Sequence, residues 1–134
     1  MSEENVEILR PVYEEWERGH FGAGQKLYDP EMTVETFMPD AAETVTLQGI
    51  GQFERFVRDW LTQWHEYRVT GEHFQEVGAD RVLVSGRQIA TGHQSGVEVE
   101  SPAFAIWTFC EGKVIKLSLH YDRDEALEAA GLTG

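Results

Sequence analysis

Three types of side chain in this chain of 134 residues are placed where they can move a proton or hold an anion. His120 stands at the predicted end of a strand, just before Asp122, and imidazole titrates near neutral pH, so it is the best acid–base candidate. Glu35 and Asp40 flank an earlier strand, and burial among apolar groups can turn a glutamate into a general base. Arg87 lies within a strand, where it either holds a ligand oxygen or pairs across strands with Glu72, Glu76 or Glu98. A solvated surface position is the alternative for each of them.

Motifs for metal, phosphate and serine chemistry are missing from the sequence. The five histidines form neither a His-x-Glu nor a His-Glu-x-x-His spacing, so we predict no metal site and no cofactor. Gly49-Ile50-Gly51 lacks the third glycine and the preceding strand of a phosphate-binding turn. The one cysteine, Cys110, excludes an internal disulfide framework, and no Gly-x-Ser-x-Gly elbow is present.

Acidic residues outnumber basic ones, with 24 Asp and Glu against 11 Lys and Arg, and the formal net charge is −13. This balance argues against nucleic acid and anionic membranes as partners, because clustered Lys and Arg bind both. No apolar run approaches the roughly 20 residues that a membrane helix needs. The acidic start of the chain also lacks the apolar run of a signal peptide, so we predict a cytoplasmic protein.

The elements that must position these side chains begin with helices. Apolar residues follow helical spacing from Val6 to Trp16, and Gly19 ends this first helix. Residues 21–27 are predicted to form a short second helix, which Asp29-Pro30 breaks. Two short strands follow, at residues 32–37 and 44–47.

The clearest helix is predicted over residues 49–64, because its apolar residues form one stripe. Burying several such aromatic side chains contributes on the order of 2 kcal/mol each before entropy costs. The stripe is first of all a core face, and lining a cavity would be an additional property. It consists of Phe53, Phe56, Val57, Trp60, Leu61 and Trp64.

Four long strands and a short helix at residues 124–130 complete the chain. The turns between the strands are short and contain glycine, so neighbouring strands should pair antiparallel. Because the strands exceed the usual length of about 5–6 residues, we expect the sheet to bend, with a bulge or irregular start at Pro102. Helices on one face of a curved antiparallel sheet give an α+β domain, here a single domain over residues 1–134. The strands are predicted at residues 67–77, 81–91, 97–109 and 113–121.

Four segments follow one another in an informative order: Leu27–Val34, Gly49-Ile50-Gly51, Phe109–Val114 with its turn and Gly-Lys pair, and the tail at residues 122–132. In this order they resemble the nuclear-transport-factor-2-like superfamily, and within it the SnoaL-like branch. The resemblance spans residues 4–131. It implies a cone-shaped α+β barrel, in which a curved antiparallel sheet wraps around the N-terminal helices and encloses a pocket.

Isomerase-like members of this superfamily use a tyrosine in the first helix and two acids in the sheet. The resemblance places the tyrosine at Tyr13 and the acids at Thr36 and Ala105, where no acid is present. A slip of one residue would turn Glu35 inward instead, since neighbouring residues of a strand face opposite sides. As counted, the missing acids argue against steroid-type isomerase activity.

The same resemblance implies a pocket that is mostly apolar, as small-molecule sites generally are. A solid aromatic core is the alternative. The related cyclases carry an acid in the last strand, where Leu117 and Leu119 fill the inward positions of this chain. Thr36, Arg87 and Ala105 are further candidate ligand contacts. The aromatic lining is predicted to be Tyr13, Trp16, Phe56, Trp60, Trp107 and Tyr121.

Two functions fit this pattern. The first is a lyase, isomerase or cyclase on a hydrophobic cyclic molecule, with Tyr13 donating a hydrogen bond and Glu35 or His120 moving a proton. The second is a ligand-binding or assembly module with the same pocket and no catalysis, which the missing acids favour. The resemblance also implies a homodimer through the outer face of the sheet, which Phe104 and Ile106 would fit if they face outward.

Overall fold

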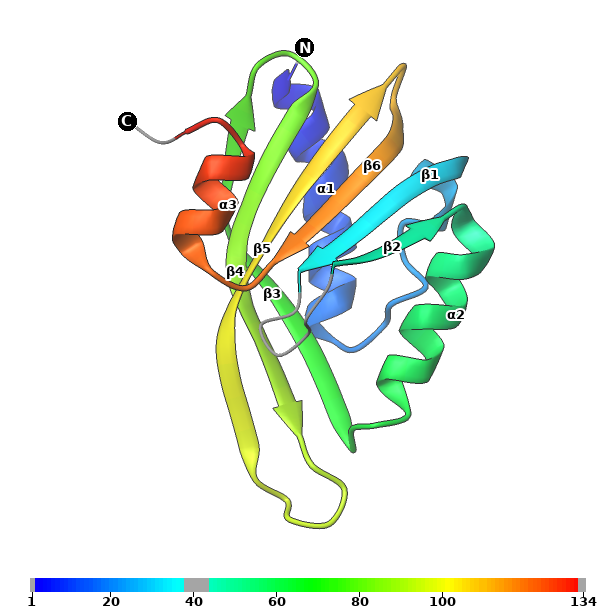
Figure 1. The fold of residues 1–134 in the computed structure, drawn as a ribbon, viewed down its shortest axis with the longest axis vertical. Coiled ribbons are helices and arrows are strands. Elements are labelled where there is room, and N and C mark those ends of the chain that lie inside the picture. The colour runs from blue at the N-terminus through cyan, green and yellow to red at the C-terminus, as the bar shows by residue number, and fades with distance from the viewer. Residues whose placement is uncertain (1, 38–43, 133–134) are drawn as a thin grey trace.

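The computed structural model describes residues 2–37 and 44–132 (Figure 1). The long helix and the four long strands that the sequence predicted are present. The helices are α1 (Ser2–Glu17), α2 (Ile50–Leu61) and α3 (Arg123–Ala129), with a 3-10 turn η1 (Gln25–Leu27). The strands are β1 (Tyr28–Phe37), β2 (Val45–Gln48), β3 (Glu66–Val77), β4 (Arg81–Thr91), β5 (Glu98–Cys110) and β6 (Lys113–His120).

The strands form one curved sheet in the order β2-β1-β6-β5-β4-β3. β3 to β6 pair antiparallel, as their short turns predicted. β1 and β6 run parallel, however, so the sheet is mixed rather than antiparallel throughout. Turn residues specify only how consecutive strands pair, whereas β1 and β6 meet after most of the chain has passed between them. The sheet curves without closing, and with its helices it forms the cone-shaped α+β fold that was expected (Figure 1).

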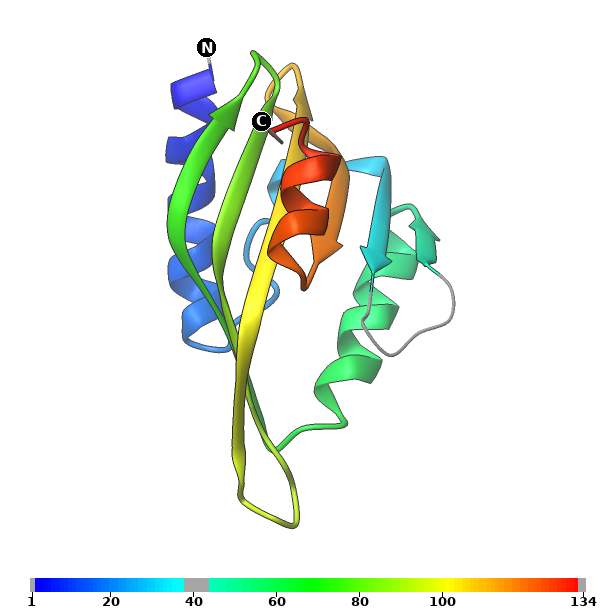
Figure 2. The same cartoon turned by 60° about the vertical axis from the view of Figure 1, so that its left-hand side comes forward.

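Helices lie on both faces of the sheet (Figure 2). α1 packs on the concave face, mainly against β3, and its Leu9 and Trp16 belong to the main hydrophobic core. α3 packs on the opposite face, where Ala126 forms a second apolar cluster with Phe104 and Ile106. The side chains of Phe104 and Ile106 therefore point outward, but α3 of the same chain covers them. A dimer through these two residues would have to displace α3.

α2 stands at the side of the sheet, next to β1 and β2 (Figure 1). Its start is tied to β1, because the N–H of Gly49 donates to the carbonyl of Met32 over 2.7 Å. Gly49 has a φ of 87°, which glycine adopts without strain. Within the described part of the chain, no helix has the length and apolar character needed to cross a membrane.

Two facing glycines let the sheet bend over α1. Gly71 of β3 lies opposite Gly86 of β4, beside a bulge in β3. A Cβ atom at Gly86 would lie 1.8 Å from the carbonyl oxygen of Thr70, and one at Gly71 would lie 2.8 Å from the ring of Tyr13. Only residues without a side chain permit this approach. No register shift occurs at Pro102, where one was expected; β5 shifts its register against β6 between Thr108 and Phe109 instead.

The segment before the first strand differs from its prediction. Of the helix predicted at residues 21–27, only η1 forms, because Gly22 and Gly24 disfavour helical structure and Gly24 has a φ of 95°. β1 starts at Tyr28, earlier than predicted, and passes through Pro30. Its register against β6 shifts between Tyr28 and Thr33, and a proline is tolerated at such an irregularity.

Candidate functional site

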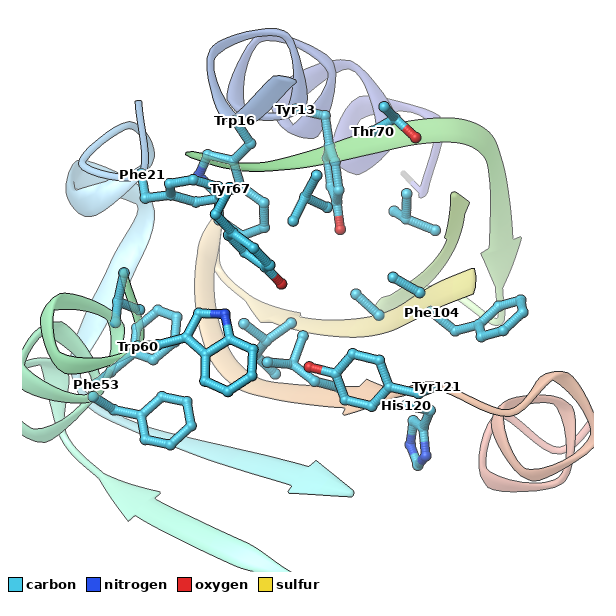
Figure 3. A pocket seen from close by; sticks show the side chains of 18 of the residues that line it. Tyr13, Trp16, Phe21, Phe53, Trp60, Tyr67, Thr70, Phe104, His120 and Tyr121 are labelled. Atoms are coloured by element: carbon cyan, nitrogen blue, oxygen red, sulfur yellow. The ribbon is translucent and has the colours of Figure 1, made fainter. Parts of the chain in front are cut away.

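A cavity of about 100 Å³ lies between α1, α2 and the concave face of the sheet (Figure 3). One buried water needs roughly 10–15 Å³ on the same scale, so the cavity has room for a molecule of about two fused rings. Its wall consists of Tyr13, Trp16, Phe21, Phe53, Phe56, Val57, Trp60, Leu61, Tyr67, Val69, Thr70, Val84, Ala103, Phe104, Ala105, Leu117, Leu119, His120 and Tyr121.

The wall is aromatic and aliphatic, and its polar atoms are mostly hydroxyls and indole N–H groups. Among the described residues that line it, none is Asp, Glu, Lys or Arg. Figure 3 shows the hydroxyls of Tyr13, Tyr67 and Tyr121 entering the cavity from different sides. Such a wall can hold an apolar molecule by shape and by a few hydrogen bonds, but it offers no ion-pair partner to a charged one.

Tyr13 comes from α1 and is held by Trp107 of β5. The Nε1–H of Trp107 donates to the Tyr13 hydroxyl over 2.9 Å, and the rings of Trp16 and Phe74 pack against the Tyr13 ring. Burial raises the pKa of Tyr13 well above its ordinary value, and the hydrogen bond from Trp107 offsets this only in part. The hydroxyl therefore stays protonated near neutral pH.

Tyr67, at the start of β3, has a different set of partners. Its hydroxyl donates to Oε1 of Gln88 over 2.6 Å, and Nε2 of Gln88 donates to Oγ of Ser101 over 2.9 Å. Burial raises the pKa of Tyr67, the nearby Tyr121 raises it further, and a hydrogen bond with Trp60 opposes the rise. Tyr67 was not among the site residues predicted from the sequence. Tyr67 and Val69 are two positions apart in the predicted strand, and residues with this spacing share one face of a sheet. This spacing could have indicated that Tyr67 lies on the same face as the apolar Val69.

Tyr121 follows β6, and its ring points into the cavity (Figure 3). Burial raises its pKa, and the Thr36 side chain beside it opposes this only in part. Thr36 is buried and lies beside Leu119 in the parallel pairing of β1 and β6, while Ala105 pairs with Leu119 from the other side. Thr36 and Ala105 thus lie on the inward face, at the positions where isomerase-like relatives were expected to carry acids.

His120 borders the cavity, but its imidazole lies on the outer face of the sheet. Strand alternation turns Leu119 inward and His120 toward α3, where Nδ1 is 3.4 Å from Oε1 of Glu125. Figure 3 shows the imidazole pointing away from the cavity, on the other side of the strand from the ring of Tyr121. In this arrangement the ring does not face a ligand held among the aromatic residues.

Glu35 also faces outward. Its carboxylate pairs with Nζ of Lys116 at 2.8 Å, and it lies next to Ser118 in the pairing of β1 with β6. The slip of one residue that would turn it inward does not occur, since Thr36 takes the inward position. Asp40, the other acid considered near this strand, lies outside the described residues.

Arg87 lies outside the cavity wall as well. Its side chain is 43% exposed, and its guanidinium pairs with Glu72 of β3 and Glu100 of β5. This is the cross-strand alternative: Glu72 is one of the predicted partners, whereas Glu100 was not predicted. The hydrogen bond from Arg87 holds the pKa of Glu72 below its usual value. An arginine engaged in this way on the outer face does not reach a ligand in the cavity.

The cavity brings together most of the predicted aromatic contacts. Trp107 is fully buried behind Tyr13 and supports the wall without lining it. In the described part of the chain, no three His, Cys, Asp or Glu side chains gather as a metal site would require. The predicted contacts that line the cavity are Tyr13, Trp16, Phe56, Trp60, Ala105, Leu117 and Tyr121, with His120 at its border.

The elements around this cavity are those of a known family. The model of the SnoaL-like domain matches residues 9–117, from α1 to β6, which is more than half of the 134 residues. The chain belongs to the SnoaL-like domain family. A comparison with curated proteins gives no match.

Solved structures show the same fold. An NTF2-like protein of unknown function from Burkholderia pseudomallei is 22% identical, with a TM-score of 0.73 over 92% of this chain and 95% of that one. Bal32a, from a soil-derived mobile gene cassette, is 17% identical, with a TM-score of 0.76 over 96% of both chains. TerC, co-crystallised with polyporic acid, is 19% identical, with a TM-score of 0.73 over 95% of this chain and 98% of that one. At these identities the likeness concerns the fold alone.

Proposed function

We propose that this SnoaL-like protein binds a small, flat, uncharged and largely apolar molecule in the cavity beneath α2. The observation that carries the proposal is the wall itself, which is aromatic and has no Asp, Glu, Lys or Arg among its described residues. A charged ligand would lose its hydration there without gaining an opposite charge, and this costs several kcal/mol or more. An uncharged ring compound loses little and gains the burial of its apolar surface.

A further feature of the wall agrees with a ring compound as ligand, and one comparison agrees with a small-molecule ligand. Aromatic side chains approach the cavity from α1, α2 and β3, so a flat molecule can stack against or meet ring edges on several sides (Figure 3). TerC, which shares the fold, was co-crystallised with polyporic acid. That likeness supports only the general proposal that a fold of this shape can hold a small molecule.

Catalysis by acid–base chemistry, in a lyase, isomerase or cyclase, is the second candidate. It is favoured by Tyr13, whose hydroxyl accepts a hydrogen bond from Trp107 and so keeps its own proton for a substrate oxygen. It is disfavoured by Glu35 and His120, which face the outer side of the sheet. We therefore place binding ahead of proton transfer. If catalysis occurs, Tyr13→Phe should lower turnover of a bound ring compound by about 10-fold or more.

Filling the cavity tests the binding proposal. Native mass spectrometry of the freshly purified protein should show an excess mass that disappears on denaturation. Ala105→Phe puts a ring into the wall and should abolish that excess mass, together with the quenching of tryptophan fluorescence by added naphthalene derivatives. Ala129→Phe, at an exposed site of α3, is the matched control and should bind as the wild type does. Equal binding by wild type and Ala105→Phe would contradict the proposal.

A homodimer and a cytoplasmic location also stay proposals. Since α3 covers Phe104 and Ile106, a dimer would use the uncovered part of the outer face, where Arg87 and its glutamates lie. Sedimentation equilibrium would then give twice the chain mass of 15.2 kDa, and Arg87→Glu would return it to the monomer value. Cell fractionation would test the location.

A further inference from the structure

The hydroxyl groups of the cavity are not equivalent, because neighbours behind the wall already use some of their hydrogen-bonding capacity. We propose that Trp107 and Gln88 are positioning residues that give the cavity a fixed polarity, with Tyr13 as a donor to a ligand carbonyl oxygen and Tyr67 as an acceptor for a ligand hydroxyl. This inference rests on the proposed binding function and specifies the ligand: an uncharged ring compound that carries both a carbonyl and a hydroxyl group.

Tyr13 is fixed as a donor by the chemistry of its partner. An indole nitrogen can only donate, so the bond of 2.9 Å from Nε1 of Trp107 must end on a lone pair of the Tyr13 oxygen. The proton of the hydroxyl is not used in that bond. Because the pKa of Tyr13 is raised by burial, the proton also stays in place near neutral pH. The hydroxyl points into the cavity, where a ligand oxygen is its natural acceptor (Figure 3).

Tyr67 has the opposite character, because its proton is already engaged. It donates to Oε1 of Gln88, and the amide of Gln88 is oriented by the bond from its Nε2 to Ser101. The ring of Trp60 meets the Tyr67 ring edge-on, with the centroids 5.9 Å apart. What Tyr67 still offers the cavity is a lone pair. Tyr121 is not fixed in this way, since the buried hydroxyl of Thr36 beside it has no hydrogen-bond partner among the described residues.

Two pairs of naphthalene probes separate the two roles. 2-Acetylnaphthalene and 2-isopropenylnaphthalene have nearly the same shape, but only the first accepts a hydrogen bond. 2-Naphthol donates a hydrogen bond, whereas 2-methoxynaphthalene does not. The dissociation constant of each probe is measured by quenching of tryptophan fluorescence and by calorimetry. The two members of a pair differ in hydration, but this difference is the same for the wild type and for each variant. The measured quantity is therefore the ratio of the two affinities within a pair, compared between wild type and variant.

Tyr13→Phe should lower the acetyl-to-isopropenyl affinity ratio by roughly 3- to 10-fold and leave the naphthol-to-methoxy ratio unchanged. Trp107→Phe should lower the first ratio by a smaller factor, because the hydroxyl remains but is no longer oriented. Gln88→Leu releases the proton of Tyr67, so it should lower the naphthol-to-methoxy ratio by roughly 3- to 10-fold. Gln75→Leu, at an exposed position of β3, is the matched control and should change neither ratio.

A merely structural role for these residues would weaken both members of a pair together and leave the ratios constant. Constant ratios in Tyr13→Phe and Gln88→Leu, with all probes still bound, would overturn the polarity and leave the binding function standing. Failure of the wild type to bind any of the four probes would overturn the binding function, and the polarity with it.

Discussion

The two faces of the sheet carry different kinds of polar group. On the outer face, Arg87 pairs with two glutamates and Glu35 pairs with Lys116, and all these groups keep part of their surface in water. On the inner face, the polar atoms around the cavity belong mainly to uncharged side chains such as Tyr13 and Tyr67, which bond to Trp107 and Gln88. The chain has a net charge of −13, yet its described cavity wall contains no carboxylate.

Residues that are adjacent in the sequence can lie on opposite faces of the sheet, one on the charged face and one on the ligand-binding face. Glu35 and Thr36 are neighbours, but one meets Lys116 in solvent and the other is 1% exposed. A charge placed where water screens it changes the free energy of folding little, whereas a charge buried away from water lowers stability. The contrast leads to expectations that differ in size between the two faces.

The largest expected effect is that of alkaline pH on the inner side. All four tyrosines of the sequence have a raised pKa, chiefly through burial. The stability they contribute is complete below about pH 10, their value in an unfolded chain, and is lost as the pH rises further. Phenolate absorbance should therefore appear together with cooperative loss of near-ultraviolet circular dichroism. Ionisation of most tyrosines in a chain that keeps this signal would contradict the assignment.

The next largest effect on stability is expected from a substitution at the bend of the sheet over α1. Gly86→Ala places a methyl group 1.8 Å from the carbonyl oxygen of Thr70. We expect a loss of about 4 kcal/mol or more in the free energy of unfolding, measured by urea denaturation. Gly51→Ala in α2, where an added Cβ meets nothing within 4 Å, is the control and should stabilise the protein by about 0.5–1 kcal/mol. Equal stability of the two variants would show that the bend does not need Gly86.

A carboxylate moved to the inner face tests the comparison most directly. Ala105→Asp should lower the free energy of unfolding by about 3 kcal/mol at neutral pH, because the new group is buried without a cation. The loss should shrink as the pH falls and the acid becomes protonated. Thr108→Asp, opposite Arg81 and Lys116 on the outer face, should change stability by less than about 0.5 kcal/mol. If both variants lost a similar amount of unfolding free energy, the proposed difference between the two faces would be wrong.

Removal of single hydroxyls distinguishes bonded from unbonded tyrosines. Tyr13→Phe leaves the buried N–H of Trp107 without its acceptor and should cost about 1–3 kcal/mol in thermal or urea unfolding. Tyr28→Phe is the matched control, since the buried hydroxyl of Tyr28 has no hydrogen-bond partner among the described residues. We expect it to be neutral or slightly stabilising. A larger loss for Tyr28→Phe than for Tyr13→Phe would contradict these assignments.

The smallest effect is expected on the outer face. Arg87→Gln should cost less than about 1 kcal/mol, because its ion pairs with Glu72 and Glu100 are exposed. The loss should fall further in high salt, which screens exposed charges. A double-mutant cycle with Glu72→Gln measures the coupling. A coupling above about 2 kcal/mol that is insensitive to salt would mean that this face behaves like a buried one.

Much of the fold followed from the sequence, and the candidate site followed in part. The spacing of Phe56 and Trp60 predicted a helix with one apolar face, and that face borders the cavity. The roles of Glu35, His120 and Arg87 could not be predicted in the same way. In a strand whose two faces both carry apolar residues, alternation does not say which face is inside, and an error of one residue reverses the answer.

Local patterns in the sequence determined the long helix, the four long strands, their antiparallel turns and the family, because these depend on residues close together in the chain. Only the tertiary structure decided that β1 pairs in parallel with β6, that the sheet bends at Gly71 and Gly86, and which partner each cavity hydroxyl meets. Tyr13 and Trp107 are 94 positions apart, and the hydrogen bond between them exists only once α1 lies on the curved sheet. Contacts of this kind depend on how whole elements pack, and packing is a property of the folded chain.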